Sequence, residues 1–229
     1  MQVILFSYMA VSCNLLGGVL FTTQNTVIKY LGIDHDALFL SLGKHLRAYI
    51  KRSQTEKLVF TEIYDSLALD NNQGLFSKVK YLYEKMFHDK GMDEHFNLEL
   101  AKQYIARHGL CIGIAYTETQ VPLGFSAIIH DKNSARLWLT AFDFRNEQLD
   151  AQVLSRAHQR LDYELLCWCN DKGITRFDFG GINSFEAPNG IAQFKLKFES
   201  NNRVVLNNYL VPNSLFGKLM LKLYLWRKR

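Results

Sequence analysis

The sequence predicts an α+β fold in which helices flank a mixed central sheet. Three observations predict it. Strand patterns at 110–116, 121–130 and 135–142 follow one another across the short polar loops "TETQ" and "DKNS", which indicates an antiparallel meander. A long helical pattern over 149–172 comes next, and then a strand pattern at 175–179. A helix that returns the chain to the same sheet makes its two flanking strands parallel, through a right-handed crossover.

The composition narrows the class of protein. The chain has 229 residues, 48% of them hydrophobic, so it can bury a sizeable core in one large or two small domains. Its net charge of +5, from 27 basic and 22 acidic residues, suits an anionic ligand but is too small to predict duplex nucleic acid as a partner. The four cysteines include no CxxC pair, which is typical of a reducing, cytoplasmic compartment.

The motifs of two large enzyme classes are missing from the sequence. The seven histidines form no HxxxH or HExxH pair, so we expect no catalytic metal. The sequence contains no GxSxG motif, which argues against a serine hydrolase. Because no linker or repeat divides the chain, we predict a single domain at 58–229. We expect residues 1–57 to form an N-terminal extension of strands and a helix that packs on this core.

The first 28 residues carry no charge. A secretory signal peptide would need a basic start and a small-residue cleavage site, and neither is clear. Polar residues and glycines interrupt the apolar run that a membrane-spanning helix would need. We therefore predict two strands around a glycine turn at Gly17 and Gly18, with membrane insertion as the alternative.

A strand pattern at 26–33 precedes a helix with two different faces. Asp34 or Asp36 can cap this helix, which continues to about residue 52 with apolar residues at helical spacing. The other face is basic and carries Lys44, His45, Arg47, Lys51 and Arg52. That face is either solvated or a landing site for an anionic substrate or lipid headgroup. From this set we assign Arg47 to substrate binding.

The segment before the meander contains a strand pattern and two helical patterns. Residues 58–63 alternate between apolar and polar side chains, as a strand does. Helical patterns follow at 75–90 and 97–108, and each is stopped by the next residue, Gly91 or Gly109.

Three further elements are predicted after the strand at 175–179. We expect a short helix around 194–198, a last strand at 203–211 and an amphipathic basic helix at 214–229. The apolar face of the last helix is expected to dock on the sheet, while its terminal basic residues contact anionic lipid headgroups. The alternative is that the whole helix lies in a membrane interface.

Two motifs carry a resemblance to a known family. "FDFGGI" at 177–182 and "NGIAQFKLKF" at 189–198 resemble the FemAB-like branch of the GNAT acyltransferase superfamily, including its BioF2-like acetyltransferases. In that branch a strand ends in Asp-Phe-Gly-Gly, and a glycine, a Phe-Lys pair and a further phenylalanine follow. The stretch "HLRAYIKRSQTEKLVFTEI" is similar to the basic helix and strand of the same branch. The resemblance covers about residues 34 to 210 and implies a GNAT-like fold.

The resemblance implies an acyltransferase, most simply an N-acetyltransferase that uses acetyl-CoA or another acyl-CoA. The acceptor would be an amine or hydroxyl of a small molecule or saccharide, such as an amino sugar or a precursor in polysaccharide biosynthesis. The larger peptidoglycan-bridge enzymes of the branch carry two such domains and use aminoacyl-tRNA, whereas this chain has length for one. The alternatives are an aminoacyl-tRNA-dependent transferase and a non-catalytic GNAT-like binding module.

The sequence departs from the family pattern at two places. GNAT enzymes usually carry a glycine-containing pyrophosphate loop before the long helix, but here the stretch is "FRNEQLDAQVL", without glycine. Glu199 stands where the branch usually has glycine after the second phenylalanine. The pyrophosphate contact is therefore not carried over to this loop.

We assign the catalytic roles to Lys195 and Asp178. Lys195 lies between apolar residues, where a cation is desolvated only if it meets an anion, so it suits a phosphate or a developing oxyanion. The alternative is a lysine that extends from an amphipathic turn into solvent. Asp178 is a candidate general base, or else a structural carboxylate paired with Arg176 or Lys195.

The remaining site residues are assigned to donor and acceptor. Gly180 and Gly181 would let a ligand approach the backbone closely, although a β-bulge or turn explains them equally well. The expected donor-binding residues are Trp138, Phe142, Arg145, Gln148, Gly180 and Gly181. The expected acceptor-binding residues are Arg47, Asn183 and Phe198.

Overall fold

The computed structural model describes residues 4–6, 19–146, 149–198, 203–211, 214, 217–220, 223 and 226. Its elements, in chain order, are β1 (Ile4–Phe6), β2 (Val19–Tyr30), α2 (His35–Leu40), α3 (Lys44–Glu56), β3 (Phe60–Tyr64), α4 (Ser66–Asp70), α5 (Gln73–His88), α6 (Leu98–Ala106), β4 (Leu110–Tyr116), β5 (Pro122–His130), β6 (Ser134–Phe142), α7 (Ala151–Asp171), β7 (Arg176–Ile182), α8 (Gly190–Leu196) and β8 (Arg203–Val211). The chain divides into two compact units. The larger holds residues 28–180 and 196–202, and the smaller holds 1–27, 181–195 and 203–229.

The larger unit is built on a mixed sheet whose strands follow the order β7-β6-β5-β4-β3. Strands β3 to β6 pair antiparallel in sequence, as the short polar loops predict. Strand β7 pairs parallel to β6, because α7 returns the chain across the sheet between them. This arrangement confirms the predicted meander and crossover.

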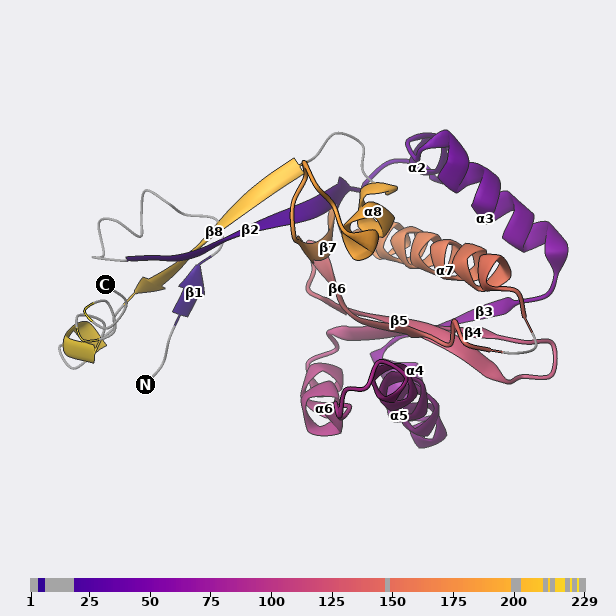
Figure 1. Cartoon of the computed structure of the whole chain (residues 1–229), viewed down its shortest axis with the longest axis horizontal. Coiled ribbons are helices and arrows are strands. Elements are labelled where there is room, and N and C mark those ends of the chain that lie inside the picture. The colour runs from indigo at the N-terminus through magenta and orange to yellow at the C-terminus, as the bar shows by residue number, and fades with distance from the viewer. Residues whose placement is uncertain are drawn as a thin grey trace. The chain divides into compact units, whose positions relative to one another are not determined.

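Helices cover both faces of this sheet (Figure 1). Helices α4, α5 and α6 lie on one face, and α2, α3 and α7 lie on the other. Every residue of β4 is buried between these layers. A methyl group added at Gly113 would lie 2.8 Å from Leu161 Cδ1 of α7, so the glycine lets the helix pack closely on the sheet. The predicted fold class, a mixed sheet flanked by helices, is confirmed.

Three elements of the larger unit differ from the prediction. The helix expected up to residue 52 is two helices, because the chain turns at 41–43 and α3 starts after Gly43. Helix α4 was not predicted; its N-cap Asp65 accepts a hydrogen bond from Ala68 N at 3.1 Å. Helix α4 has five residues, which are too few to show a helical period. Only residues 71 and 72 separate it from α5, so the sequence shows no clear loop between the two helices.

The smaller unit contains an antiparallel arrangement of β1, β8 and β2. Strand β8 pairs with β1 through Leu5 and Leu210 and with β2 through Asn25 and Val205. The predicted strands at the start of the chain are therefore present, but β2 also takes in residues 26–30, which the sequence predicts as part of a separate strand. The predicted turn at Gly17 and Gly18 lies outside the described residues.

The loop that follows β7 in the smaller unit is held by its own side chains. Asn183 Nδ2 donates to Ala187 O at 3.0 Å, and Asn183 Oδ1 accepts from Asn189 N at 3.1 Å. Helix α8 then begins at Gly190, four residues earlier than predicted. Among the described residues, no helix combines the length and the apolar character that crossing a membrane requires.

Candidate functional site

The parallel strands β6 and β7 are paired over only part of their length. The paired register consists of Ser134 with Arg176, Ala135 with Phe177 and Arg136 with Asp178. Strand β6 continues to residue 142 and β7 to residue 182. The two strands therefore separate beyond their third pair, at the carboxyl ends of the parallel strands.

A β-bulge in β6 lies at the point of separation. Leu137 pairs with Ile128 of β5 and Leu139 pairs with Ala127, so Trp138 is an extra residue between them. A bulge bends its strand and increases the local twist. Because Trp138 comes two residues after the last residue paired with β7, the bulge accounts for the course of β6 away from β7.

Two predicted donor-binding residues, Trp138 and Phe142, lie on β6 at and after this bulge. Trp138 contacts the rings of Phe96 and Tyr104, at centroid distances of 6.4 and 5.3 Å, on the face covered by α5 and α6. Phe142 belongs to the cluster beneath α7 and stacks on His158 at 4.2 Å. The structure thus places the two aromatic residues on opposite faces of β6 and does not bring them together.

A buried polar cluster lies between α7 and the sheet, beside the separating strands. Ser126 Oγ of β5 donates to Asp162 Oδ1 at 2.6 Å and lies 3.2 Å from Thr140 Oγ1 of β6. His158 Nε2 lies 3.0 Å from Thr140 Oγ1 and 3.7 Å from Asp162 Oδ2. Ser126, His158 and Asp162 are all buried.

Burial holds the His158 imidazole neutral. Burial lowers the pKa of His158 to about 3, and the positive charge of Lys197 acts in the same direction. The neighbouring Asp162 carboxylate would favour the charged imidazolium, but the loss of hydration outweighs it. A neutral imidazole can hydrogen-bond Thr140 without bringing an unpaired charge into the core.

The sequence contains one signal for this cluster. His158 and Asp162 are four residues apart and share the face of α7 that carries Leu154, Leu161 and Leu165. Polar residues on an apolar stripe must find partners in the core. The partners, Ser126 and Thr140, occupy inward positions of two strands, which the alternation pattern alone does not pair.

The side chain of Asp178 stabilises the bend at the end of β7. Its Oδ1 accepts a hydrogen bond from Gly180 N at 2.7 Å, and both residues are buried. Gly180 has φ +78°, a backbone conformation that side chains with Cβ disfavour. The structure therefore gives Asp178 and Gly180 a shared structural role, and their assignments as base and donor contact stay predictions.

In the smaller unit, the lysine of the Phe-Lys pair is held by the backbone. Lys195 Nζ donates to Gly181 O at 2.9 Å. A Cβ built on Gly181 would lie 2.0 Å from Gln24 Nε2, so the side chain of Gln24 occupies the space beside this glycine. The unit thus brings Lys195, Gly181 and the loop residue Asn183 into one compact region.

Two predicted acceptor-binding residues of the larger unit have structural contacts. Arg47 Nη1 donates to the carbonyl oxygens of Leu40 and Leu42, at 2.5 and 3.0 Å, and so closes the end of α2. Phe198 is fully buried and its ring packs on Phe179 with centroids 4.8 Å apart. These contacts favour packing and capping roles, and contact with an acceptor stays a prediction for both.

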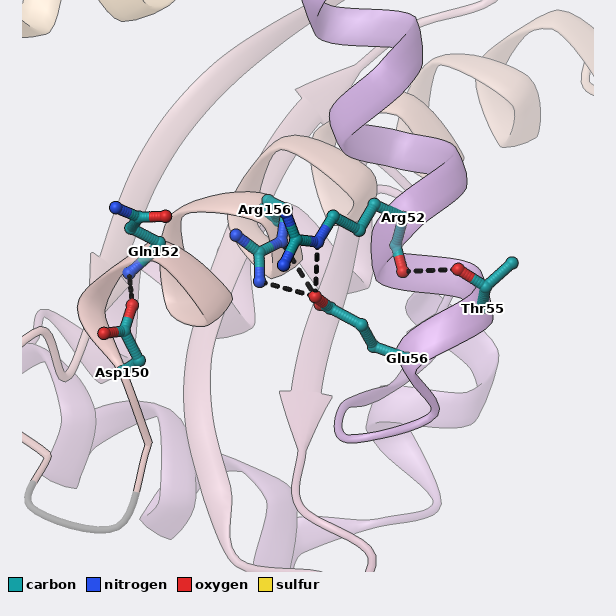
Figure 2. A network of polar contacts seen from close by, with 6 residues as sticks. All are labelled: Arg52, Thr55, Glu56, Asp150, Gln152 and Arg156. Atoms are coloured by element: carbon teal, nitrogen blue, oxygen red, sulfur yellow. Dashed lines mark hydrogen bonds and ion pairs between the residues drawn. The ribbon is translucent and has the colours of Figure 1, made fainter.

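The N-terminus of α7 carries a carboxylate instead of an open set of N–H groups (Figure 2). Asp150 Oδ1 accepts from Gln152 N at 2.6 Å. Of the two polar residues predicted to contact donor phosphate, Arg145 is exposed in the turn before this helix, and Gln148 lies outside the described residues. An anionic group at this helix end would have to lie beside the Asp150 carboxylate.

An ion-pair network joins α3 to the second turn of α7. Figure 2 shows Glu56 between two guanidinium groups: Arg156 Nη2 lies 2.7 Å and Arg52 Nε lies 2.8 Å from Glu56 Oε1. Burial alone would raise the pKa of Glu56, but the hydrogen bonds from Arg156 and Arg52 outweigh it and hold that pKa below its usual value. With two guanidinium groups and one carboxylate, the network leaves one surplus positive charge, and Arg52 is the more exposed of the two arginines.

Among the described residues, no group of three or more His, Cys, Asp and Glu side chains is placed to hold a metal ion.

Comparison with known proteins identifies the fold. No protein-family model and no curated protein sequence matches the chain. Among solved structures, a C-terminal domain assigned to a lysylphosphatidylglycerol synthetase of Agrobacterium fabrum aligns with TM-score 0.64 and 13% identity, over 96% of this chain and 71% of that one. FemX aligns with TM-score 0.64 and 12% identity, over 95% and 74%. L-PGS from Bacillus licheniformis aligns with TM-score 0.57 and 15% identity, over 96% and 71%. At these identities the likeness shows the fold.

Proposed function

Because the chain has the GNAT-type fold in its FemAB-like form, we propose that it transfers an acyl group from an activated donor to an amine or hydroxyl. The observation that carries this proposal is the separation of β6 and β7 after Arg136 and Asp178. Separated strands leave backbone N–H and C=O groups that need partners. An extended arm with amide groups can bind such an edge as an added strand.

We propose an acyl-CoA as the donor. Its pantetheine arm is extended and contains amides, so it matches the unpaired edges of β6 and β7 chemically. Lys195 would stabilise the developing oxyanion or a donor phosphate, and Asp178 would accept the proton of the nucleophile. The acceptor is proposed to be an amino sugar or another saccharide precursor of cell-surface polysaccharide, reached from the cytoplasm.

One observation favours a second candidate, an aminoacyl-tRNA donor. The Asp150 carboxylate occupies the N-terminus of α7, where it neutralises the positive end of the helix dipole. This arrangement disfavours a donor whose pyrophosphate lies at that helix end. An aminoacyl ester, whose phosphates can bind elsewhere on the protein, avoids this conflict.

A thermal-shift series with matched donors tests the proposal. We would compare acetyl-CoA, longer acyl-CoAs, acetyl-pantetheine, charged tRNA and nucleotide sugars at equal concentrations. A donor at about 100 times its Kd stabilises the folded state by about 2.7 kcal/mol, which raises the Tm by several degrees. Acetyl-pantetheine is the control that keeps the amide arm and removes the nucleotide.

Each outcome assigns the donor. A shift with acetyl-CoA and acetyl-pantetheine supports the acyl-CoA transferase. A shift with charged tRNA alone would replace it with the aminoacyl transferase. If no acyl donor shifts the Tm and the protein consumes none, the transferase proposal fails and a non-catalytic binding module takes its place.

We further propose that the C-terminal segment contacts anionic membrane from the cytoplasmic side. The described helical residues there include Leu219, Leu223 and Trp226, which are exposed. Lys218, Lys222 and the final Arg-Lys-Arg are interspersed with them in the sequence. Exposed leucine and tryptophan combined with basic residues are typical of helices that bind anionic interfaces.

A further inference from the structure

Two cavities of the larger unit adjoin each other, and the second lies at the amino ends of β6 and β7. The first, of about 530 Å³, lies among α4, α5 and α6. The second, of about 750 Å³, lies between the end of α6, the β5–β6 turn and the end of α7. Both are lined by Ser66, Leu67 and His108, so they are adjacent, and we call the two together the groove. Each volume falls in the range of small-molecule sites, about 300–1,000 Å³.

The first cavity, which we call the apolar trough, is lined mainly by carbon. Its apolar wall consists of Leu67, Leu69, Phe76, Phe96, Leu98 and Ile105. Leu67, at the junction with the second cavity, is 68% exposed. The two lysines that line the trough, Lys80 and Lys102, already have acidic neighbours, with Glu84 at 3.9 Å and Glu99 at 3.0 Å. The trough therefore suits an apolar chain.

The second cavity, which we call the basic cleft, is lined by two carboxylates that accept hydrogen bonds from backbone N–H groups. Asp131 Oδ1 accepts from Asn133 N and Ser134 N, both at 2.8 Å. Asp65 caps α4 and lies 3.8 Å from Lys172 Nζ. These contacts hold the two carboxylates in place, and both carboxylates keep their negative charge.

The basic cleft is lined by three cations and two carboxylates, so it has a surplus of one positive charge. Arg107 and Lys132 line it, and neither has an acidic partner or a hydrogen-bond acceptor among the described residues. The third cation, Lys172, lies 3.8 Å from Asp65 Oδ2 and 5.4 Å from the centroid of the Trp168 ring. Because Arg107 and Lys132 both face the same exposed cavity, they favour an anionic group there.

We propose that the groove binds a single-chain anionic amphiphile. Its hydrocarbon chain lies in the apolar trough, and its phosphate or carboxylate head lies in the basic cleft near Arg107 and Lys132. Burial of the methylene groups in the apolar trough stabilises such a complex, while the basic cleft selects the charge of the head. The groove lies at the opposite end of the β6–β7 pair from the point where the strands separate, so this proposal is independent of the transfer reaction.

Calorimetric titration with three probes tests the head and the chain separately. The probes are dodecyl phosphate and dodecyltrimethylammonium, each below its critical micelle concentration, and inorganic phosphate. We expect dodecyl phosphate to bind, and the cationic amphiphile and the bare phosphate to bind at least about tenfold more weakly, a difference of about 1.4 kcal/mol. Equal binding of the two amphiphiles would overturn the proposal, as would binding of phosphate alone with full affinity.

Matched variants locate the site. The double variant Arg107→Gln/Lys132→Gln should weaken binding of dodecyl phosphate about 30-fold, from the loss of two charges beside the head. Leu67→Gln, an exposed change in the wall, should weaken it several-fold. The control Lys57→Gln/Lys90→Gln removes the same charge from residues that line neither cavity and should bind normally. Unchanged affinity in the Arg107/Lys132 variant, or an equal loss in the control, would disprove the site.

Discussion

At the scale of single residues, Lys195 is the most direct test of the proposed chemistry. The hydrogen bond from its Nζ to Gly181 O, at 2.9 Å, holds the ammonium group beside the glycine pair at the end of β7. We expect Lys195→Ala to lower kcat/KM about 100- to 1,000-fold, the usual cost of losing one oxyanion donor. The measurement is release of free thiol from the acyl-CoA that the thermal-shift series identifies.

The matched control is Lys197→Ala. Lys197 is exposed and its Nζ lies 5.9 Å from the centroid of the Tyr49 ring, so this variant should retain wild-type turnover. Lys195→Arg should retain part of the activity, because it keeps the charge and changes the geometry. Wild-type turnover in Lys195→Ala would remove Lys195 from the mechanism.

The buried imidazole of His158 predicts a loss of stability in acid. Its pKa is lowered to about 3 in the folded chain, whereas an unfolded histidine titrates near 6.5. Between pH 6.5 and pH 3 the unfolded state binds the additional proton, so the free energy of unfolding falls as the pH falls. At pH 4.5 the loss from this group is about 3 kcal/mol relative to pH 7.

Urea unfolding at pH 7 and pH 4.5 measures this loss. His158→Gln keeps a polar partner for Thr140 and should lose much less stability in acid than the wild type. His45→Gln, which replaces an exposed histidine, should behave like the wild type. The same acid loss in His158→Gln would show that other groups account for it.

The residues of the site were predictable from sequence to different degrees. Lys195, Gly180 and Gly181 stand in motifs of adjacent residues, so the resemblance to the FemAB-like branch is enough to propose them. The contacts of these residues were not predictable, because Gln24 and Gly181 are far apart in the chain and meet only after folding. Ser126, Thr140, His158 and Asp162 come from three elements, and no local pattern links them.

At the scale of elements, the glycine pair at the end of β7 has two explanations that the sequence leaves open. The glycines either let a ligand approach the backbone or serve the local structure. The Gln24 side chain fills the position where a Cβ of Gly181 would lie. If the glycine is there to accommodate Gln24, Gly181→Ala should lower the Tm by several degrees, and the double variant Gln24→Ala/Gly181→Ala should recover most of that loss. Thermal melts of the four proteins in this cycle measure the coupling.

Donor binding by the same four proteins tests the other explanation. If a ligand approaches the backbone at Gly181, the double variant should regain stability but still bind donor weakly. Recovery of both properties would show that Gly181 serves only the packing of Gln24. Failure to recover stability would show that the conflict lies with another neighbour.

Local patterns determined some element boundaries well and missed others. The predicted strands at 110–116 and 203–211 coincide with β4 and β8, because turns or helix ends bound each apolar run. The bulge at Trp138 was not predictable, because it is set by the register against β5 and the sequence of β6 alternates normally. The break between α2 and α3 depends on a turn at Gly43, which a continuous helical period conceals.

At the scale of the whole molecule, long-range pairing limits what sequence can predict. The order of elements from β3 to β7 indicated the sheet of the larger unit, because neighbours in sequence are neighbours in that sheet. The smaller unit joins residues 19–27 to 203–210, and nothing in either segment identifies the other as its partner. The predicted division at residues 57 and 58 stays a prediction, although α2, α3 and β3 lie in one compact unit.

The last prediction concerns the C-terminal segment, for which the structure favours a different outcome from the one that the sequence predicts. The sequence led us to expect the apolar face of this helix to be docked on the sheet. In the structure, Leu219 is 55% exposed, Leu223 48% and Trp226 76%, so these residues contribute little to a core. We therefore expect deletion of residues 217–229 to leave the Tm nearly unchanged, and to abolish sedimentation with vesicles that contain anionic lipid.

Charge and apolar contact should both contribute to this binding. Each basic residue near an anionic surface contributes about 1 kcal/mol, so binding should weaken as salt rises, and neutral vesicles should bind poorly. The variant Leu219→Gln/Leu223→Gln/Trp226→Gln keeps the charge and removes the apolar contact, so it should bind weakly even at low salt. A deletion that lowers the Tm by several degrees, with vesicle binding intact, would instead mean that the segment supports the fold and that another surface contacts the membrane.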